Sequence, residues 1–123
     1  MAQLRVLIAD DHAPFTEALR ALLALDERLE VVGVASDGQQ AIDMAVDLKP
    51  DVVLMDISMP ILDGVEATKR LRELVPDACV LMLTGSNARS DVNRSRDAGA
   101  AGYVTKDRID DALVDTILSV GAR

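Results

Sequence analysis

The sequence predicts an α/β protein built on a doubly wound, five-stranded parallel β-sheet with helices on both faces. Short apolar runs rich in β-branched residues alternate five times with stretches in which apolar residues recur at helical spacing. The runs are apolar on both faces, which is typical of buried parallel strands, and right-handed crossovers then place helices on either side of the sheet. The length of 123 residues corresponds to a single domain.

The five expected strands are short and mostly apolar. They cover residues 4–9, 29–35, 52–55, 79–83 and 103–105. Because the chain has one phenylalanine, one tyrosine and no tryptophan, its core must consist of leucine, valine, isoleucine, alanine and methionine. The single cysteine, Cys79, is expected to be one of the small apolar core residues.

The first two helices are marked by residues that favour helix starts and stops. Pro14 fits the first turn of the first helix, where its missing N–H removes no hydrogen bond. Asp37 and Gly38 open the second helix, and Lys49 ends it because a residue before proline is pushed out of the α region. The apolar faces are expected to comprise Phe15, Ala18, Leu19, Leu22 and Leu23, then Ala41, Ile42, Ala45 and Val46.

The sequence predicts the remaining three helices with apolar faces of different extent. The third carries Val65, Thr68 and Leu71 on one face, and the last is capped by Asp110. The last helix is expected to bury Leu113, Ile117 and Val120, and to keep Val114 and Leu118 off its core face. Residues 87–97 contain only Ala88 and Val92 as apolar residues, so the fourth helix is expected to be poorly anchored.

Composition excludes several classes of function. Thirteen basic against 21 acidic residues give a net charge of -8, so this domain is not expected to contact nucleic acid. One cysteine and one histidine exclude a disulfide framework and a zinc cluster. No apolar run suits a membrane span, and the N-terminus lacks the features of a signal peptide, so we expect a cytoplasmic protein.

Chemistry-bearing residues follow four of the five strands. Asp10 and Asp11 follow the first strand, Asp56 the third, Thr84 the fourth and Lys106 the fifth. In an open parallel sheet, ligands bind beyond the carboxyl ends of the strands, near the point where the strand order reverses. We therefore expect these five side chains to form one site.

Three neighbouring carboxylates need a compensating cation. Two unit charges about 5 Å apart repel by roughly 3 kcal/mol at an effective dielectric constant near 20. Mg²⁺ prefers such oxygen ligands, and together with Lys106 it would neutralise the three aspartates. The neutral pocket could then accept a phosphoryl group on a carboxylate, with Asp56 as the best candidate nucleophile. Thr84 could donate its hydroxyl to a phosphate oxygen, and Gly85 would leave room for the group.

These residues, with their neighbours, resemble the receiver domain of a two-component response regulator over the whole chain. The matching pieces are Asp10-Asp11, Asp56 with Met59-Pro60 and Asp63-Gly64, Thr84-Gly85, and the run from Ala98 to Lys106. The resemblance implies the flavodoxin-like strand order 2-1-3-4-5.

The resemblance also implies the role of each site residue. Asp56 would be the phosphoacceptor, and Lys106 would pair with the phosphoryl group. Mg²⁺ would be held by Asp56, Asp11 and the backbone carbonyl of Ser58, with Asp10 acting mostly through water. Thr84 and Tyr103 would be a switch pair that moves when Asp56 is phosphorylated.

One departure from the family pattern points to a subgroup. Most receivers have proline after the site lysine, whereas Asp107 follows Lys106 here, so we expect a trans peptide bond. Lys106-Asp107 together with the Asp-Asp-His start resembles the NarL/LuxR-type subgroup. The resemblance implies a sensor histidine kinase as partner, a homodimer after phosphorylation, and a C-terminal helix-turn-helix DNA-binding domain, which the 123 residues do not contain. A stand-alone receiver acting through protein contacts is the alternative.

Two other classes of function fit less well. A phosphatase of the haloacid-dehalogenase kind needs a second aspartate two residues after its nucleophile, but Ser58 occupies that place. A binding module that no longer needs phosphate would have lost Asp56 or Lys106. Ser58 and Ser86, both small and neutral, are expected to leave an open route for the water that attacks the phosphoryl group.

Overall fold

The computed structural model describes residues 3–85 and 89–121 as five strands alternating with five helices. The strands are β1 (Leu4–Ala9), β2 (Leu29–Ala35), β3 (Val52–Asp56), β4 (Cys79–Thr84) and β5 (Gly102–Thr105). The helices are α1 (Ala13–Ala24), α2 (Gly38–Leu48), α3 (Gly64–Leu74), α4 (Arg89–Asp97) and α5 (Asp111–Gly121). The predicted elements are all present, with bounds that differ by one or two residues at the ends.

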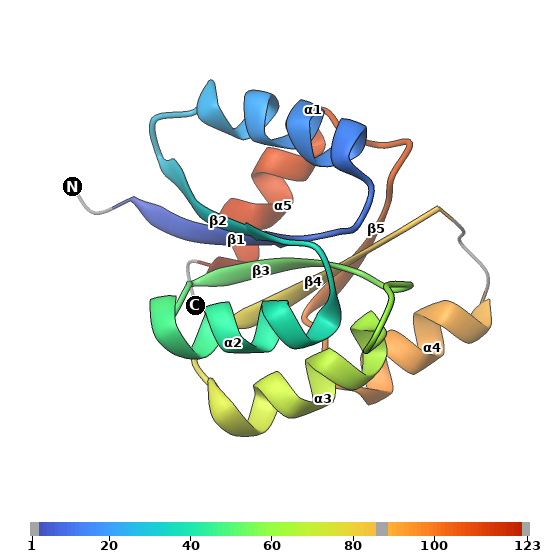
Figure 1. Cartoon of the computed structure of the whole chain (residues 1–123). Helices are drawn as coiled ribbons and strands as arrows, with labels where there is room; N and C mark the ends of the chain where they lie inside the picture. The colour runs from blue at the N-terminus through green and yellow to red at the C-terminus, as the bar shows by residue number, and fades with distance from the viewer. Residues whose placement is uncertain (1–2, 86–88, 122–123) are drawn as a thin grey trace.

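The sheet is parallel throughout and has the strand order β2-β1-β3-β4-β5. Helices α1 and α5 cover one face, and α2, α3 and α4 cover the other (Figure 1). The strand order reverses between β1 and β3, which are neighbours in the sheet. The carboxyl ends of these two strands therefore form the edge at which a ligand site is expected.

Alternate residues of the central strands supply two separate hydrophobic layers. Val6, Ile8, Leu54 and Leu81 belong to the layer under α1 and α5, which consists of branched aliphatic residues at its centre. The opposite layer, under α2, α3 and α4, is built on the intervening positions of the strands. Its members from β1, β3 and β4 are Leu7, Ala9, Val53, Met55, Val80 and Met82.

Helix ends follow the polar residues that the sequence places there. Pro14 occupies the first turn of α1. Asp37 caps α2 by accepting a hydrogen bond from the Gln40 N–H, and Asp63 caps α3 in the same way. Asp110 accepts a hydrogen bond from the Ala112 N–H at the start of α5. The predicted starts of α1, α2 and α5 are therefore confirmed.

Three predictions about helix faces are wrong. Ala18 and Val46 are exposed, the latter to 45%, because each lies at the margin of the apolar stripe of its helix. Val114 is buried, since the wide face of α5 packs against both the sheet and α1. Cys79 is only half-buried, at the start of β4.

Helix α4 is anchored by a buried serine and by the alanine that follows the helix. Ser95 is almost fully buried, and its hydroxyl donates to the carbonyl of Asp91 within the helix. Ala98 is buried just beyond the helix end, whereas Val92 is half-buried. A hydroxyl satisfied inside its own helix can be buried at little cost, so a polar sequence still provides a core contact here. Ala88, the other apolar residue of this segment, lies outside the described residues.

Ile61, in the loop between β3 and α3, combines backbone strain with exposure. Its φ of 69° lies in the left-handed region, which costs a β-branched residue about 1–2 kcal/mol. Its side chain is 82% exposed, so little packing offsets that strain. We expect Ile61→Gly to raise the free energy of unfolding by about 1 kcal/mol in urea denaturation. Ile61→Val keeps the branched Cβ and should give no gain; an equal gain would contradict the assignment of strain.

Candidate functional site at the carboxyl edge of the sheet

The fold brings the predicted polar residues to one edge. Asp10 and Asp11 directly follow β1, and Asp56 is the last residue of β3. Thr84 is the last residue of β4, and Lys106 follows β5. The Lys106 N–H donates to the Thr84 carbonyl at 2.7 Å, which extends the pairing of these two strands up to the site. The register of the sheet thus decides which side chains meet.

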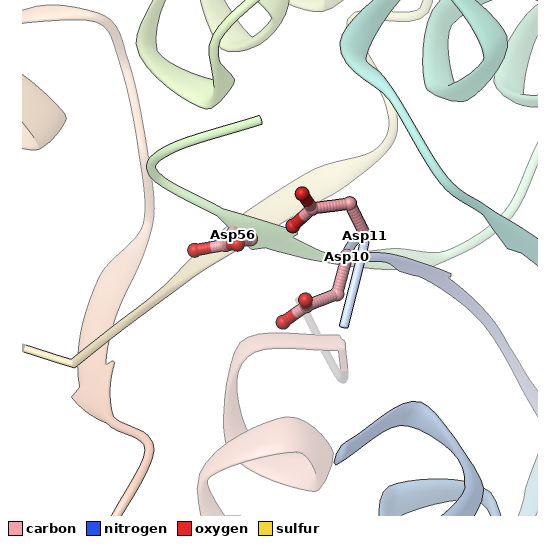
Figure 2. A group of neighbouring side chains, drawn as sticks. All are labelled: Asp10, Asp11 and Asp56. Carbon is pink, nitrogen blue, oxygen red and sulfur yellow. The ribbon is translucent and has the colours of Figure 1, made fainter. Parts of the chain in front are cut away.

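The three aspartates form a compact acidic cluster at the ends of β1 and β3 (Figure 2). One carboxylate oxygen from each lies within 4.8 Å of the others. Asp10 and Asp56 are only 2% and 5% exposed, whereas Asp11 is exposed. Two buried carboxylates and one at the surface therefore face a common space that opens to solvent on the Asp11 side.

Lys106 is the cation of this cluster in the described structure. Its Nζ lies 2.6 Å from Asp10 Oδ2 and 3.4 Å from Asp56 Oδ2. Burial lowers the pKa of Lys106, but the carboxylates of Asp10 and Asp56 outweigh this and hold the pKa above its ordinary value. The ammonium group is therefore fully charged at neutral pH.

Asp56 is held in an environment that disfavours its charge. Burial raises the pKa of this carboxyl, and the neighbouring Asp10 carboxylate raises it further. Lys106 and the Ser58 N–H, 3.4 Å from Asp56 Oδ1, act in the opposite direction without cancelling the rise. The cluster therefore carries more negative charge than its one lysine compensates, and a second cation or the loss of a charge would stabilise it.

The donor set of this edge fits a hard divalent cation. All three aspartates offer carboxylate oxygens, the ligands that Mg²⁺ prefers, and the open side leaves room for the waters it retains. Asp10 Oδ2 is buried, and its partner is the Lys106 ammonium, 2.6 Å away. A buried carboxylate oxygen beside two others is suited to a metal or to its bound water.

The remaining predicted residues lie around the cluster. Ser58 is exposed in the loop after β3, and Thr84 is buried beside Asp56 on the neighbouring strand. Tyr103 is half-buried against the layer under α2, α3 and α4 and pairs in register with Met82. The Lys106-Asp107 peptide bond is trans, as expected. Ser86 lies outside the described residues.

Two further residues contact the site without a role having been predicted for them, although Gly64 belongs to one of the pieces that carry the family resemblance. The Phe15 ring lies under the Lys106 ammonium, with Nζ 4.6 Å from the ring centroid. Gly64 is so close to the end of β3 that a Cβ on it would lie 2.0 Å from the carbonyl oxygen of Asp56. The sequence signal that could have pointed to Phe15 is its position, four residues after Asp11 and directly after a proline that starts a helix.

Comparison with known proteins places this arrangement in a family. The model of the response regulator receiver domain matches residues 6–118. The transcriptional regulatory protein LnrK of Bacillus subtilis is 39% identical over 117 residues, which cover 95% of this chain and 53% of LnrK. The nitrate/nitrite response regulator NarP of Escherichia coli is 42% identical over 113 residues, which cover 92% of this chain and 53% of NarP.

The solved structures agree with this family and with its subgroup. The signal receiver domain of NarL from Mycobacterium tuberculosis has a TM-score of 0.94 and 31% identity to this chain, with 99% of this chain and 98% of that domain covered. The chain spans about half the length of the curated relatives it matches. These matches and the strand order together show that the chain belongs to the response regulator receiver domains of two-component systems, among relatives of the NarL/LuxR type.

Proposed function

We propose that this receiver is a phosphorylation-dependent switch that accepts a phosphoryl group on Asp56 from a sensor histidine kinase. The observation that carries the proposal is the meeting of Asp56, two further aspartates and Lys106 at one sheet edge. Lys106 would neutralise charge on the transferred phosphoryl oxygens, and the buried Asp56 carboxylate would be the nucleophile. Family membership supports the same assignment, because such domains partner with histidine kinases.

The chemistry at Asp56 is a phosphoryl transfer with Mg²⁺ as cofactor. A carboxylate oxygen of Asp56 attacks phosphorus, and the bond from phosphorus to the donor nitrogen breaks while its electron pair stays on the donor imidazole. Asp11, Asp56 and the Ser58 carbonyl would hold Mg²⁺, with Asp10 acting through water. The metal would neutralise negative charge on the phosphoryl oxygens during transfer. Thr84, buried beside Asp56, would donate its hydroxyl to the phosphorylated form.

The output of the switch is the more distant part of the proposal. Thr84 and Tyr103 would change position together after phosphorylation and alter the surface of β5 and α5. Because relatives about twice as long are transcriptional regulatory proteins, we propose that the phosphorylated domain dimerises and controls a C-terminal DNA-binding domain in the cytoplasm. A stand-alone receiver acting through protein contacts is the alternative. No helix in the described part of the chain has the length and apolarity that a bilayer crossing requires.

Phosphate uptake tests the proposal directly. With acetyl phosphate and Mg²⁺, intact mass spectrometry should show one added phosphoryl group, and chelation of Mg²⁺ should abolish the addition. Asp56→Asn should show none, because an amide is not a nucleophile of this kind. Asp77→Asn, in the exposed turn before β4 at the opposite end of the sheet, is the matched control and should be modified normally. Modification that survives Asp56→Asn would reject the assignment.

A further inference from the structure

The Lys106 ammonium has a third neighbour besides its two carboxylates. Its Nζ lies 4.6 Å from the centroid of the Phe15 ring, as well as 2.6 Å from Asp10 and 3.4 Å from Asp56. An ammonium within about 6 Å of a ring centroid is attracted by the negative face of the ring, and more strongly where water is excluded. The Lys106 side chain is 21% exposed, so this contact is partly shielded from water.

The fold brings the Phe15 ring and the Lys106 ammonium together from two separate elements. Phe15 lies in the first turn of α1, next to Pro14 and only four residues after Asp11. It is half-buried against the layer under α1 and α5, which restrains its position. Lys106 directly follows β5, which is an edge strand of the sheet. The contact therefore joins the beginning of α1 to the end of β5 across the site.

A neutral aromatic ring has a property that a third carboxylate would lack. The two aspartates attract the Lys106 ammonium, but they also repel an incoming phosphoryl group. The ring attracts the ammonium without adding negative charge, so it holds Lys106 in the pocket and leaves it free to pair with phosphoryl oxygens. An aliphatic side chain of similar size would fill the same space but would not attract the cation.

We propose that Phe15 is a positioning residue for phosphoryl transfer, which keeps the Lys106 ammonium directed into the site through its aromatic face. This inference rests on the proposed function of Asp56 as phosphoacceptor. It predicts that the electron density of the ring, and not only its volume, affects the rate of phosphorylation. A purely structural Phe15 would depend on volume alone.

The composition of the chain allows an unusually clean experiment. Phe15 is the only phenylalanine among the 123 residues, so global replacement of phenylalanine by fluorinated analogues alters one ring. Mono-, di- and trifluorophenylalanine weaken the negative face stepwise with little change in volume. The rate of phosphorylation by acetyl phosphate and Mg²⁺ should fall stepwise, by about two- to fivefold in total. Equal rates across the series at equal folding stability would overturn the proposal.

Natural variants separate the electronic role from the packing role. Phe15→Tyr keeps an aromatic face and should retain the rate, whereas Phe15→Leu should lose as much as the most fluorinated ring. Both rates are compared with the free energy of unfolding of each variant. A slow Phe15→Tyr variant with unchanged stability would count against the aromatic contact.

A readout independent of phosphorylation completes the test. The ¹⁹F resonance of monofluorophenylalanine at position 15 should shift in Lys106→Met but not in Arg108→Met, which removes an exposed cation two residues away. If the unaltered protein takes up no phosphoryl group, the proposed function of Asp56 fails, and the ¹⁹F shift alone then decides the contact. An unshifted resonance in Lys106→Met would overturn the inference whatever the phosphorylation result.

Discussion

Gly64→Ala is expected to lower the free energy of unfolding by roughly 3 kcal/mol or more, the upper end of the range for overpacking a close contact. The added Cβ would lie 2.0 Å from the carbonyl oxygen of Asp56 and 3.0 Å from Cα of Ile57. These are backbone atoms at the end of a central strand, so no side chain can rotate to relieve the clash. Helix α3 and the end of β3 would have to move apart, which would displace Asp56.

Urea denaturation of matched glycine variants tests this expectation. Gly85→Ala is the control, since no described heavy atom lies within 4 Å of a Cβ built there. It should leave the free energy of unfolding within about 0.5 kcal/mol of that of the unaltered protein. Gly64→Ala should also slow phosphorylation wherever it remains folded, because it displaces the carboxylate that accepts the group. A Gly64→Ala variant as stable as Gly85→Ala would contradict the close approach of α3 to Asp56.

The second large effect concerns the charges around Asp56. Lys106→Met should lower the free energy of unfolding by roughly 2 kcal/mol, less than the loss of a fully buried partner because the ammonium is partly exposed. Asp56→Asn should raise it by about 1 kcal/mol, or roughly 4 °C in Tm, since it removes a buried charge that Asp10 repels. In the double variant, Lys106→Met should lower the free energy of unfolding by less, because only one of the two carboxylates that pair with Lys106 remains.

The gain in stability from Asp56→Asn is expected to depend on pH. The folded state holds a proton on Asp56 more tightly than the unfolded state, because burial and Asp10 raise the pKa of this carboxyl above 3.8. The contribution of Asp56 is therefore most favourable below pH 3.8 and is lost as the pH rises through the raised value. Thermal unfolding without Mg²⁺ should show the gain from Asp56→Asn growing across this interval. A gain that is largest at low pH would contradict it.

The fold could be predicted from the sequence because its main signals are strong and repeated. Five apolar runs that alternate with helical periodicity admit few architectures, and Pro14, Asp37 and Asp110 begin their helices where capping chemistry places them. The convergence of Asp10, Asp11 and Asp56 also followed from strand ends alone, since parallel strands present their carboxyl ends at one edge. The exact order of the strands came from family resemblance.

The details that escaped the sequence depend on distances between separate elements. Periodicity does not fix how wide a buried helix face is. Val46 was therefore wrongly predicted to be on the buried face, and Val114 wrongly predicted to be off it. Ser95 looked like a weak helix former, but its internal hydrogen bond allows it to be buried. The contact between Phe15 and Lys106 joins residues 91 positions apart, and only the assembled sheet brings the ring under the ammonium.

The two hydrophobic layers differ in mechanical character as well as in composition. Met55, Met59 and Met82 are buried in the layer under α2, α3 and α4, with Met44 packed against it, whereas the opposite layer contains none among the described residues. Methionine is unbranched and adapts its shape, while leucine, valine and isoleucine resist deformation. The layer under α2, α3 and α4 is thus the one with adaptable side chains, and Tyr103 packs on it. A movement of the Tyr103 ring would therefore meet the more adaptable of the two layers.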